Sequence, residues 1–291
     1  MSQNVIIVGA PRSGTNMLRD VLTSARGITT WPCDEVNLLW KHGNLDIASD
    51  EIPADRATPA VRRYLRKQFA AIGAKASADV VVEKTCATSL RVPFAAACFP
   101  DAKYVFIHRD GIDATASTMQ RWNAAFDLGY TLRKVRYVPP SDLPRHLAAF
   151  AGKKVRQLRS GDAGSAANDL LVSTWWGPRP HDYADLQRHH PLEELAFIQW
   201  QRCVEQSADA LAHLPGDQVL TVRYEDYVSD PHTGTGRILD FLGVGDRLAS
   251  AAVGKVMTSS VGKGRAQLGP EAVSRLVGLG GTTLERFGYD A

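Results

Sequence analysis

The chain has 291 residues, of which 44% are hydrophobic, and a net charge of +3. This length is enough for one full α/β core, and so mild a charge argues against a nucleic-acid binder, whose cations normally gather in one stripe. Four cysteines without a Cys-x-x-Cys pair argue against a secreted disulfide scaffold and favour a reduced, cytoplasmic location. The sequence also predicts neither a signal peptide nor a transmembrane helix.

A candidate anion site comes first in the chain. An apolar strand predicted over residues 4–9 runs into a Pro/Gly loop and then into a helix predicted over 15–25. Backbone N–H groups of such a loop and of the first helical turn converge on one small volume, so phosphate or sulfate fits there. In a Walker A loop the second glycine is followed by lysine and then by serine or threonine. Here Thr15 stands at the lysine position and Asn16 at the serine or threonine position. The cation lies inside the loop instead, at Arg12.

A second anion site is predicted after the strand expected at 103–108. Arg109 ends this strand, and Ser117 lies eight residues further, about two turns along a helix expected at 111–121. A forked cation and a hydroxyl can therefore converge on one anion. Two anion sites at successive strand ends indicate a nucleotide with phosphates at both ends.

The remaining pattern predicts the fold. Two further strands are expected, at 79–82 and at 217–223. A helical pattern follows the first at 88–98 and the second at 232–242. Alternation of strands and helices is typical of a parallel sheet flanked by helices on both faces. Ligands then belong at the carboxyl ends of the strands. Between about 122 and 190 the pattern is irregular, which predicts a lid or acceptor-binding insertion, and a long helix is expected from Leu192 to about His213. We expect a single domain over residues 1–291.

Several motifs together resemble one family. Pro11-Arg12-Ser13-Gly14-Thr15 is similar to the 5'-phosphosulfate loop, and Arg109-Asp110-Gly111 followed by Ser117 to the 3'-phosphate motif, of sulfotransferases that use 3'-phosphoadenosine 5'-phosphosulfate (PAPS). Further similar motifs keep the family's order: Glu83-Lys84-Thr85, Pro100-Asp101-Ala102-Lys103-Tyr104, Arg223-Tyr224-Glu225-Asp226-Tyr227 and Ser259-Ser260-Val261-Gly262-Lys263-Gly264-Arg265. The loop resembles the branch that includes tyrosylprotein sulfotransferases and many bacterial enzymes.

The resemblance implies a P-loop-like α/β fold and an enzyme that moves a sulfuryl group from PAPS to an acceptor hydroxyl. The expected chemistry is in-line displacement with a carboxylate base, adenosine 3',5'-bisphosphate as product, and no required metal. Arg12 and Lys84 are the implied stabilising cations, Lys84 because it ends its strand at the same crevice. Glu35 is the implied base, and the choice between it and the neighbouring Asp34 stays open.

The same resemblance implies a set of nucleotide-binding residues: Pro11, Arg12, Ser13, Gly14, Thr15, Asn16, Arg109, Ser117, Tyr224, Lys263 and Arg265. Tyr224 matches the position that lies against the adenine, and Lys263 and Arg265 belong to a basic loop over the 3'-phosphate. Asp34, Trp175 and Trp176 are candidates for binding the acceptor, with packing in the core or lid as the alternative for the two tryptophans.

Three questions remain open at this stage. The first is the acceptor, which is a small molecule, carbohydrate, lipid or other hydroxyl compound. The second is the oligomeric state, since a homodimer is compatible with the sequence. The third is the function itself, for which two rivals remain. One rival function is a P-loop small-molecule kinase, although the chain has no Gly-Lys-Ser/Thr loop. The other is a nucleotide-binding module without catalysis, which turnover would distinguish.

Overall fold

The fold is seen in a computed structural model that describes residues 2–122, 175, 177–245, 253, 254, 256 and 258–291. Its sheet has five strands in the order β2-β3-β1-β4-β5, and every neighbouring pair is parallel. The strands are β1 (Gln3–Val8), β2 (Ile28–Thr29), β3 (Val80–Lys84), β4 (Lys103–His108) and β5 (Val219–Arg223). The predicted α/β class with a parallel sheet is confirmed.

The register of the strands gathers their carboxyl ends at one edge. In the middle of the sheet, β1 pairs with β3 and β4, and Ile7 lies opposite Lys84 on one side and Val105 on the other. On the outer side of β4, His108 pairs with Arg223. The loops that follow these strands therefore start close together, which is where ligands bind in parallel α/β sheets.

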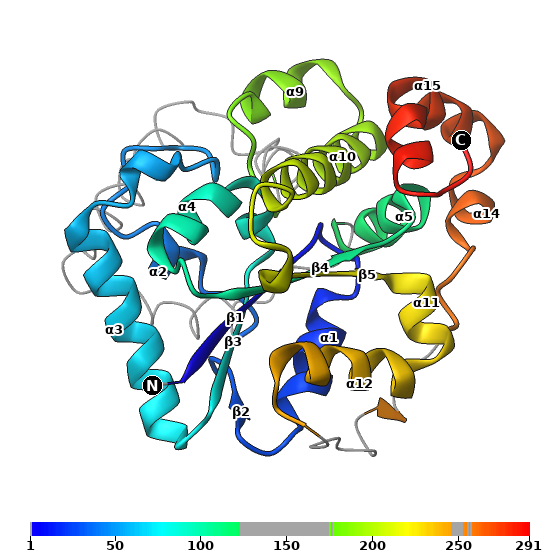
Figure 1. The fold of residues 1–291 in the computed structure, drawn as a ribbon. Coiled ribbons are helices and arrows are strands. Elements are labelled where there is room, and N and C mark those ends of the chain that lie inside the picture. Colours follow the sequence, from blue (N-terminus) through cyan, green and yellow to red (C-terminus); the bar gives the residue numbers. More distant parts are fainter. Residues whose placement is uncertain (1, 123–174, 176, 246–252, 255, 257) are drawn as a thin grey trace, which may run out of the picture.

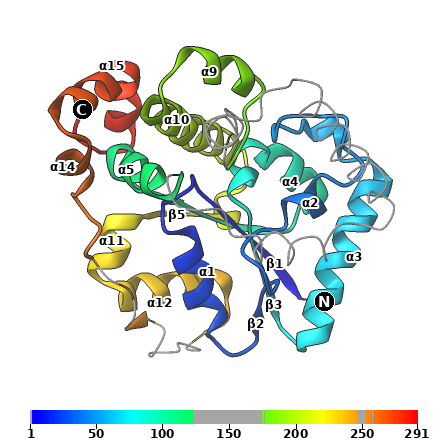
Figure 2. The same cartoon turned by 180° about the vertical axis from the view of Figure 1, so that it is seen from behind.

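Helices cover both faces of the sheet (Figures 1 and 2). Successive strand residues point to opposite faces, so Ile6 and Ile7 of β1 belong to two separate apolar cores. The Ile6 core includes residues of α2 (Asn37–Trp40), α3 (Pro59–Ala76), α4 (Val92–Cys98), α5 (Gly111–Trp122), α10 (Leu192–Leu211) and α15 (Pro270–Arg286). The Ile7 core includes residues of α1 (Thr15–Thr23), α11 (Tyr224–Ser229) and α12 (Pro231–Leu242).

The helix predicted at 88–98 is split in two. A 3₁₀ turn, η2 (Cys86–Leu90), is followed by α4, and Arg91 between them has non-helical angles of φ −146° and ψ 31°. Proline is favoured in a first helical turn, where its missing N–H is not needed. Pro93 therefore marks the start of α4 rather than the middle of a longer helix.

Among the described α-helices and strands, those not predicted are β2, α2, α3, α9 (Tyr183–His189), α11 (Tyr224–Ser229), α14 (Gly264–Leu268) and α15. For α3 the sequence does contain a start signal. Thr58 caps the helix by accepting a hydrogen bond from the Val61 N–H, and Pro59 occupies the first turn.

Most of the predicted lid at 122–190 lies outside the described residues, which omit 123–174 and 176. The described remainder of that segment includes α9 (Tyr183–His189), and the long helix predicted from Leu192 is present as α10. Among the helices that the structure describes, none is both long and apolar enough to cross a membrane.

Candidate functional site

A cleft of about 350 Å³ opens at the carboxyl edge of the sheet. Its walls come from the loop between β1 and α1, the segments that follow β2 and β3, α5 with the turn before it, and the start of α11. The lining residues are Pro11, Arg12, Gly14, Thr15, Asn16, Met17, Glu35, Lys84, Cys86, Arg109, Ser117, Tyr224 and Ser260. The fold thus brings most of the predicted site residues into one cavity.

The first wall is the loop that joins β1 to α1. Arg12 has φ 67° and Gly14 has φ 85°, both in the left-handed region that L side chains rarely adopt. No side chain caps the start of α1 among the described residues, and its first turn contains no acidic residue. The N-terminal amides and the positive end of the helix dipole therefore lie beside the cleft, as an anion site requires.

Gly14 also has a spatial reason to be glycine. A Cβ atom at this position would lie 2.6 Å from Cδ2 of the Tyr224 ring. Tyr224 is buried at the start of α11, directly after β5. The anion loop and the end of β5 are therefore in close contact through this ring.

A buried lysine and a partly exposed carboxylate meet in the cleft. Lys84 Nζ donates to Glu35 Oε1 at 2.9 Å, and the Cys86 N–H donates to the same oxygen at 3.2 Å. The Lys84 side chain is 2% exposed and the Glu35 side chain 24%. Burial opposes the charge of Lys84, but the acidic groups of Cys86 and Glu35 outweigh it, so the pKa of Lys84 is raised above its ordinary value.

A chain of hydrogen bonds holds the segment that contains Glu35. The Val36 N–H donates to Thr85 Oγ1 at 3.1 Å, and the Thr85 hydroxyl donates to Glu83 Oε1 at 2.6 Å. Glu83 is fully buried at the end of β3, and burial raises its pKa to about 7, against the lowering effect of the Thr85 hydrogen bond. The backbone next to Glu35 is thus fixed to the strand that carries Lys84.

The two predicted anion sites are adjacent. Arg12 Nε donates to Ser117 Oγ at 2.9 Å, and Arg109 Nη1 donates to the Arg12 carbonyl at 3.1 Å. Burial, with repulsion from Arg121 and Arg109, lowers the pKa of the Arg12 guanidinium. Several cations therefore converge here, which favours an anionic ligand with more than one charged group.

Arg109 is held on three sides. Its guanidinium lies over the Tyr224 ring, with Cζ 4.6 Å from the ring centroid, and Nη2 is 3.4 Å from Asp113 Oδ2. Nη2 also donates to the Ser260 carbonyl at 2.5 Å. Its buried Nε has no hydrogen-bond partner among the described residues.

The sequence and the fold of this chain are similar to those of known proteins. A sequence profile of the Sulfotransferase family matches residues 4–151 and 174–247, well over half of the chain. The chain belongs to the sulfotransferase family. No curated protein matches it.

Solved sulfotransferase structures share the fold at low identity. The sulfotransferase domain from the curacin biosynthetic pathway is 13% identical, with 100% of this chain and 99% of that chain covered and a TM-score of 0.54. The sulfotransferase domain from the Synechococcus PCC 7002 olefin synthase is 16% identical, with 100% and 96% covered and a TM-score of 0.53. A sulfotransferase from Alicyclobacillus acidocaldarius is 15% identical, with 98% and 94% covered and a TM-score of 0.51.

Sequence reasoning assigned no role to Asp113 and Ser260 of this sulfotransferase. Asp113 accepts hydrogen bonds from the Gly262 and Gly264 N–H groups at 2.7 and 2.6 Å, which ties the segment around them to α5. Ser260 of that segment lines the cleft, where its hydroxyl lies 2.9 Å from the Tyr224 hydroxyl. The position of Asp113, one helical turn after Arg109, is the sequence signal that could have revealed its role.

Two predicted basic residues of the same segment lie outside the cleft lining. Lys263 is exposed, and Arg265 donates from Nη2 to the Asp290 carbonyl. The structure therefore brings Ser260 of this loop to the cleft rather than either cation.

Other predicted residues also lie away from the cleft. Asp34 is 43% exposed and lies 3.5 Å from Arg19 Nη1, on the outer side of the Glu35 segment. Trp175 is buried and donates from Nε1 to the Pro178 carbonyl at 2.6 Å. Trp176 is outside the described residues. Ser13 is completely buried behind the loop, and its Oγ has no hydrogen-bond partner among the described residues.

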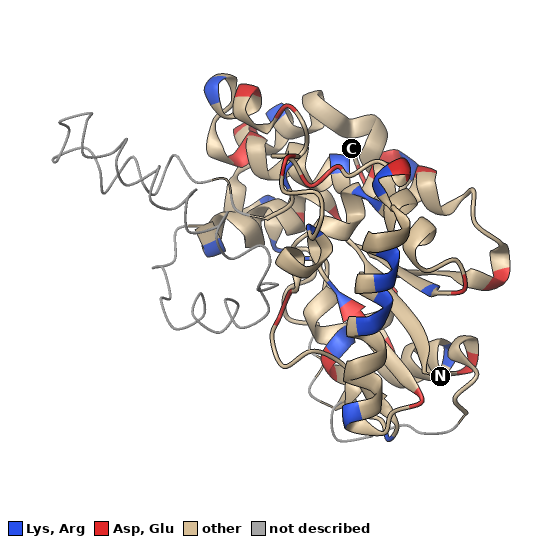
Figure 3. Ribbon diagram, turned by 90° about the vertical axis from the view of Figure 1, so that its left-hand side faces the viewer, with Lys and Arg blue, Asp and Glu red and all other residues tan. Residues whose placement is uncertain are grey.

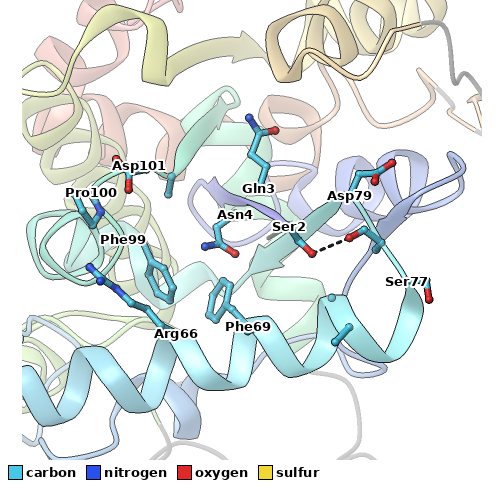
Figure 4. Close-up of a pocket in the computed structure, with 15 residues that line it drawn as sticks. Ser2, Gln3, Asn4, Arg66, Phe69, Ser77, Asp79, Phe99, Pro100 and Asp101 are labelled. Carbon is cyan, nitrogen blue, oxygen red and sulfur yellow. Dashed lines mark hydrogen bonds between the residues drawn. The ribbon is translucent and has the colours of Figure 1, made fainter.

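A larger hollow, of about 690 Å³, lies at the opposite edge of the sheet (Figure 4). It is bordered by α3 and by the amino ends of β1 and β4, with Phe69 and Phe99 on one side and Gln3 and Asn4 on the other. Arg66 at its rim is engaged through an Nε hydrogen bond to the Cys98 carbonyl. Pro100, Asp101 and Ala102 of one family motif line this hollow, but no predicted catalytic or nucleotide-binding residue does, so its size does not make it the candidate active site.

Proposed function

We propose that the chain transfers the sulfuryl group of PAPS to a hydroxyl of an acceptor. The observation that carries this proposal is the pairing of Lys84 with Glu35 in the same cleft as the anion loop. A buried cation and an accessible carboxylate, side by side at a strand end, supply charge stabilisation and a proton acceptor together. PAPS would contribute the activated sulfuryl group and a nucleotide leaving group.

The cleft has groups suited to both charged ends of such a donor. The loop around Arg12 and the start of α1 would hold the 5'-phosphosulfate. Arg109 and Ser117 would hold the 3'-phosphate. Arg109, which belongs to the second of these motifs, lines the cleft together with Ser117. Tyr224, between the loop and Arg109, would contact the adenine.

We assign the chemistry to three side chains. Glu35 would take the proton of the acceptor hydroxyl, because its carboxylate lines the cleft and is partly exposed there. Lys84 and Arg12 would stabilise the charge that develops on the transferred group and on the leaving phosphate, which dominates catalysis in the related case of phosphoryl transfer. No protein-bound metal is assigned to this step.

Several broader features belong to the same proposal. The acceptor is a small molecule, carbohydrate or lipid, approached partly through the predicted segment at 122–190, and residues 1–291 act as one domain. No disulfide joins any of the four cysteines in the part of the chain that the structure describes, which suits the proposed cytoplasmic location.

Ligand-dependent stability tests the nucleotide assignment. Adenosine 3',5'-bisphosphate at a hundredfold excess over its dissociation constant should stabilise the fold by about 2.7 kcal/mol, and adenosine 5'-monophosphate at the same concentration much less. Arg109→Ala should remove this discrimination, whereas Arg188→Ala, which alters an exposed ion pair with Asp185, should keep it. Equal melting-temperature shifts with both nucleotides for the unmodified chain would exclude the proposed 3'-phosphate site.

A further inference from the structure

The last residues of the chain fold back after α15. Gly288 has φ 76°, and its N–H donates to the Glu285 carbonyl at 3.0 Å, while the Tyr289 N–H donates to the Leu284 carbonyl at 2.9 Å. These two bonds are those of a glycine-terminated helix end, which reverses the chain direction. The C-terminus lies on the same side of the molecule as α5 and α11 (Figures 1 and 2), and Figure 3 shows basic and acidic positions next to it. Tyr289 is buried there, with 6% of its surface exposed.

The Tyr289 hydroxyl lies between two side chains at the carboxyl edge of the sheet. It donates to Glu225 Oε2 at 3.1 Å, and it lies 2.8 Å from Nδ1 of His108. A phenol has one proton, so with that proton on the bond to Glu225 its oxygen accepts from the His108 Nδ1–H. The Arg223 guanidinium covers the ring, with Cζ 4.9 Å from the centroid, and donates from Nη2 to the Gly288 carbonyl at 3.2 Å. The ring and its hydroxyl are therefore both fixed.

Glu225 in turn holds the backbone that follows Arg109. Its second oxygen, Oε1, accepts from the Asp110 N–H at 3.0 Å, and the Arg109 carbonyl accepts from Trp200 Nε1 at 3.0 Å. Both polar groups of the peptide between Arg109 and Asp110 are thus bonded to side chains of other helices, α11 and α10. A Cβ atom on Gly111 would lie 2.6 Å from the Trp200 ring, so the indole is packed directly against this turn. The direction in which Arg109 leaves β4 depends on these contacts.

We propose that Tyr289 is a positioning residue for nucleotide recognition: by holding Glu225, it fixes the turn from which Arg109 would bind the 3'-phosphate. This inference rests on the proposed function, which gives Arg109 that role. A guanidinium fork matches a phosphate only in a narrow range of orientations, so a small rotation of the peptide behind it weakens binding. Tyr289 lies outside the cleft lining and beyond the residues that the family profile matches, so its effect passes through Glu225.

A second buried tyrosine provides the matched control. Tyr227 is 2% exposed and lies on α11, the helix that carries Glu225. Its hydroxyl is 2.8 Å from Thr235 Oγ1 of α12, away from the cleft lining. Tyr289→Phe and Tyr227→Phe therefore remove the same group from two buried rings. If Tyr289 served the fold alone, both substitutions would lower stability and leave the relative affinities for different nucleotides unchanged.

Nucleotide titration calorimetry on the full chain separates the two roles. In Tyr289→Phe the Kd of adenosine 3',5'-bisphosphate should rise about tenfold, as is typical when a hydrogen bond to a charged group is lost. The Kd of adenosine 5'-monophosphate, which lacks the phosphate assigned to Arg109, should stay within about twofold. Tyr227→Phe should leave both Kd values within about twofold. Thermal unfolding of each variant without nucleotide reports the cost to the fold.

Variants of Glu225 test the intermediate step. Glu225→Ala should weaken bisphosphate binding at least as much as Tyr289→Phe does, whereas Glu225→Gln keeps an oxygen for the Asp110 N–H and should recover most of the affinity. Because Tyr289 acts through Glu225, adding Tyr289→Phe to Glu225→Ala should change the Kd by less than about twofold. The Glu225 pair still decides the matter if Tyr289→Phe does not fold, since failure of glutamine to restore the affinity lost in alanine would contradict the proposed contact.

The possible failures are distinguishable. A preference for the bisphosphate that is unchanged in Tyr289→Phe, an equal loss in Tyr227→Phe, or full additivity in the double variant would overturn the role of Tyr289 and leave the 3'-phosphate site intact. An unmodified chain that binds both nucleotides equally would instead exclude the 3'-phosphate site itself, and the role of Tyr289 with it.

Discussion

Lys84 Nζ lies 2.9 Å from Glu35 Oε1, and the two residues come from different parts of the chain. Lys84 ends β3, whereas Glu35 belongs to the segment between β2 and α2. The ammonium is buried and the carboxylate is partly open to the cleft, so the cation lies behind the base. Such an arrangement pairs Glu35 with a cation while leaving its carboxylate accessible from the cleft.

Replacing Glu35 by glutamine tests its role as the base. Glu35→Gln keeps an oxygen that can accept from Lys84 Nζ and the Cys86 N–H, so shape and nucleotide affinity should change little. Turnover should fall by 10²–10⁴-fold, as is typical when a positioned acid or base is lost. The measurement is kcat with PAPS and a responsive acceptor, beside the Kd of adenosine 3',5'-bisphosphate.

Asp34→Asn is the control for the neighbouring acid. Asp34 lies outside the cleft lining and faces Arg19, so its amide variant should retain turnover within a few-fold. A collapse of turnover in Asp34→Asn, with Glu35→Gln still active, would move the base one residue upstream.

Thr85 should affect catalysis through the position of Glu35. Thr85→Val removes the hydroxyl that links the Val36 N–H to Glu83, while Thr85→Ser keeps it. We expect kcat to fall about tenfold or more in Thr85→Val and to recover largely in Thr85→Ser, with little change in nucleotide Kd. If Thr85→Ser loses kcat while Thr85→Val keeps it, packing of the Thr85 methyl group, and not the hydrogen bond, is what the site requires.

Glu83 should make stability depend on pH. Burial raises its pKa from 4.5 to about 7, so the folded chain holds this proton more tightly than the unfolded chain. The free energy of unfolding should therefore fall by up to about 3 kcal/mol from this group as pH rises from 4.5 to 7. Glu83→Gln removes the effect, and urea unfolding at pH 5 and pH 8 should show the variant gaining on the unmodified chain at the higher pH. A constant difference between the two proteins would contradict a neutral Glu83 in the folded state at low pH.

Transfer should not depend on a divalent metal. Arg12 and Lys84 are proposed to provide the charge that magnesium provides in kinases. Initial rates in excess EDTA should therefore stay within about twofold of the rates without it. Activity that disappears on chelation and returns with added magnesium would favour the kinase alternative.

The strands of the core were predictable because their chemistry is local. Residues 4–9, 79–82 and 103–108 are short apolar runs, and β1, β3 and β4 lie within two residues of those limits. In contrast, β2 contains only Ile28 and Thr29, and its pairing with β3 depends on tertiary contacts that no short pattern records. For α15, two further glycines and a non-helical Gly280 conceal the helical periodicity.

The candidate site was predictable where a motif places a residue at a strand end. Arg12, Lys84, Arg109 and Tyr224 all lie in the cleft for that reason. The contact between Arg12 and Ser117 joins residues 105 positions apart, and the positions of Lys263 and Arg265 depend on how Asp113 fixes their loop. Such details follow from packing between segments, which the sequence pattern alone does not determine.

The contact between Gly14 and the Tyr224 ring has a consequence for protein engineering. Because no side chain fits between them, the anion loop and the end of β5 form a matched pair although 210 positions separate them in the chain. A chimera that exchanges the loop with that of a distant relative would need to exchange the segment around Tyr224 at the same time. A smaller residue at position 224 would not by itself permit a side chain at position 14, because Gly14 also has a φ of 85°.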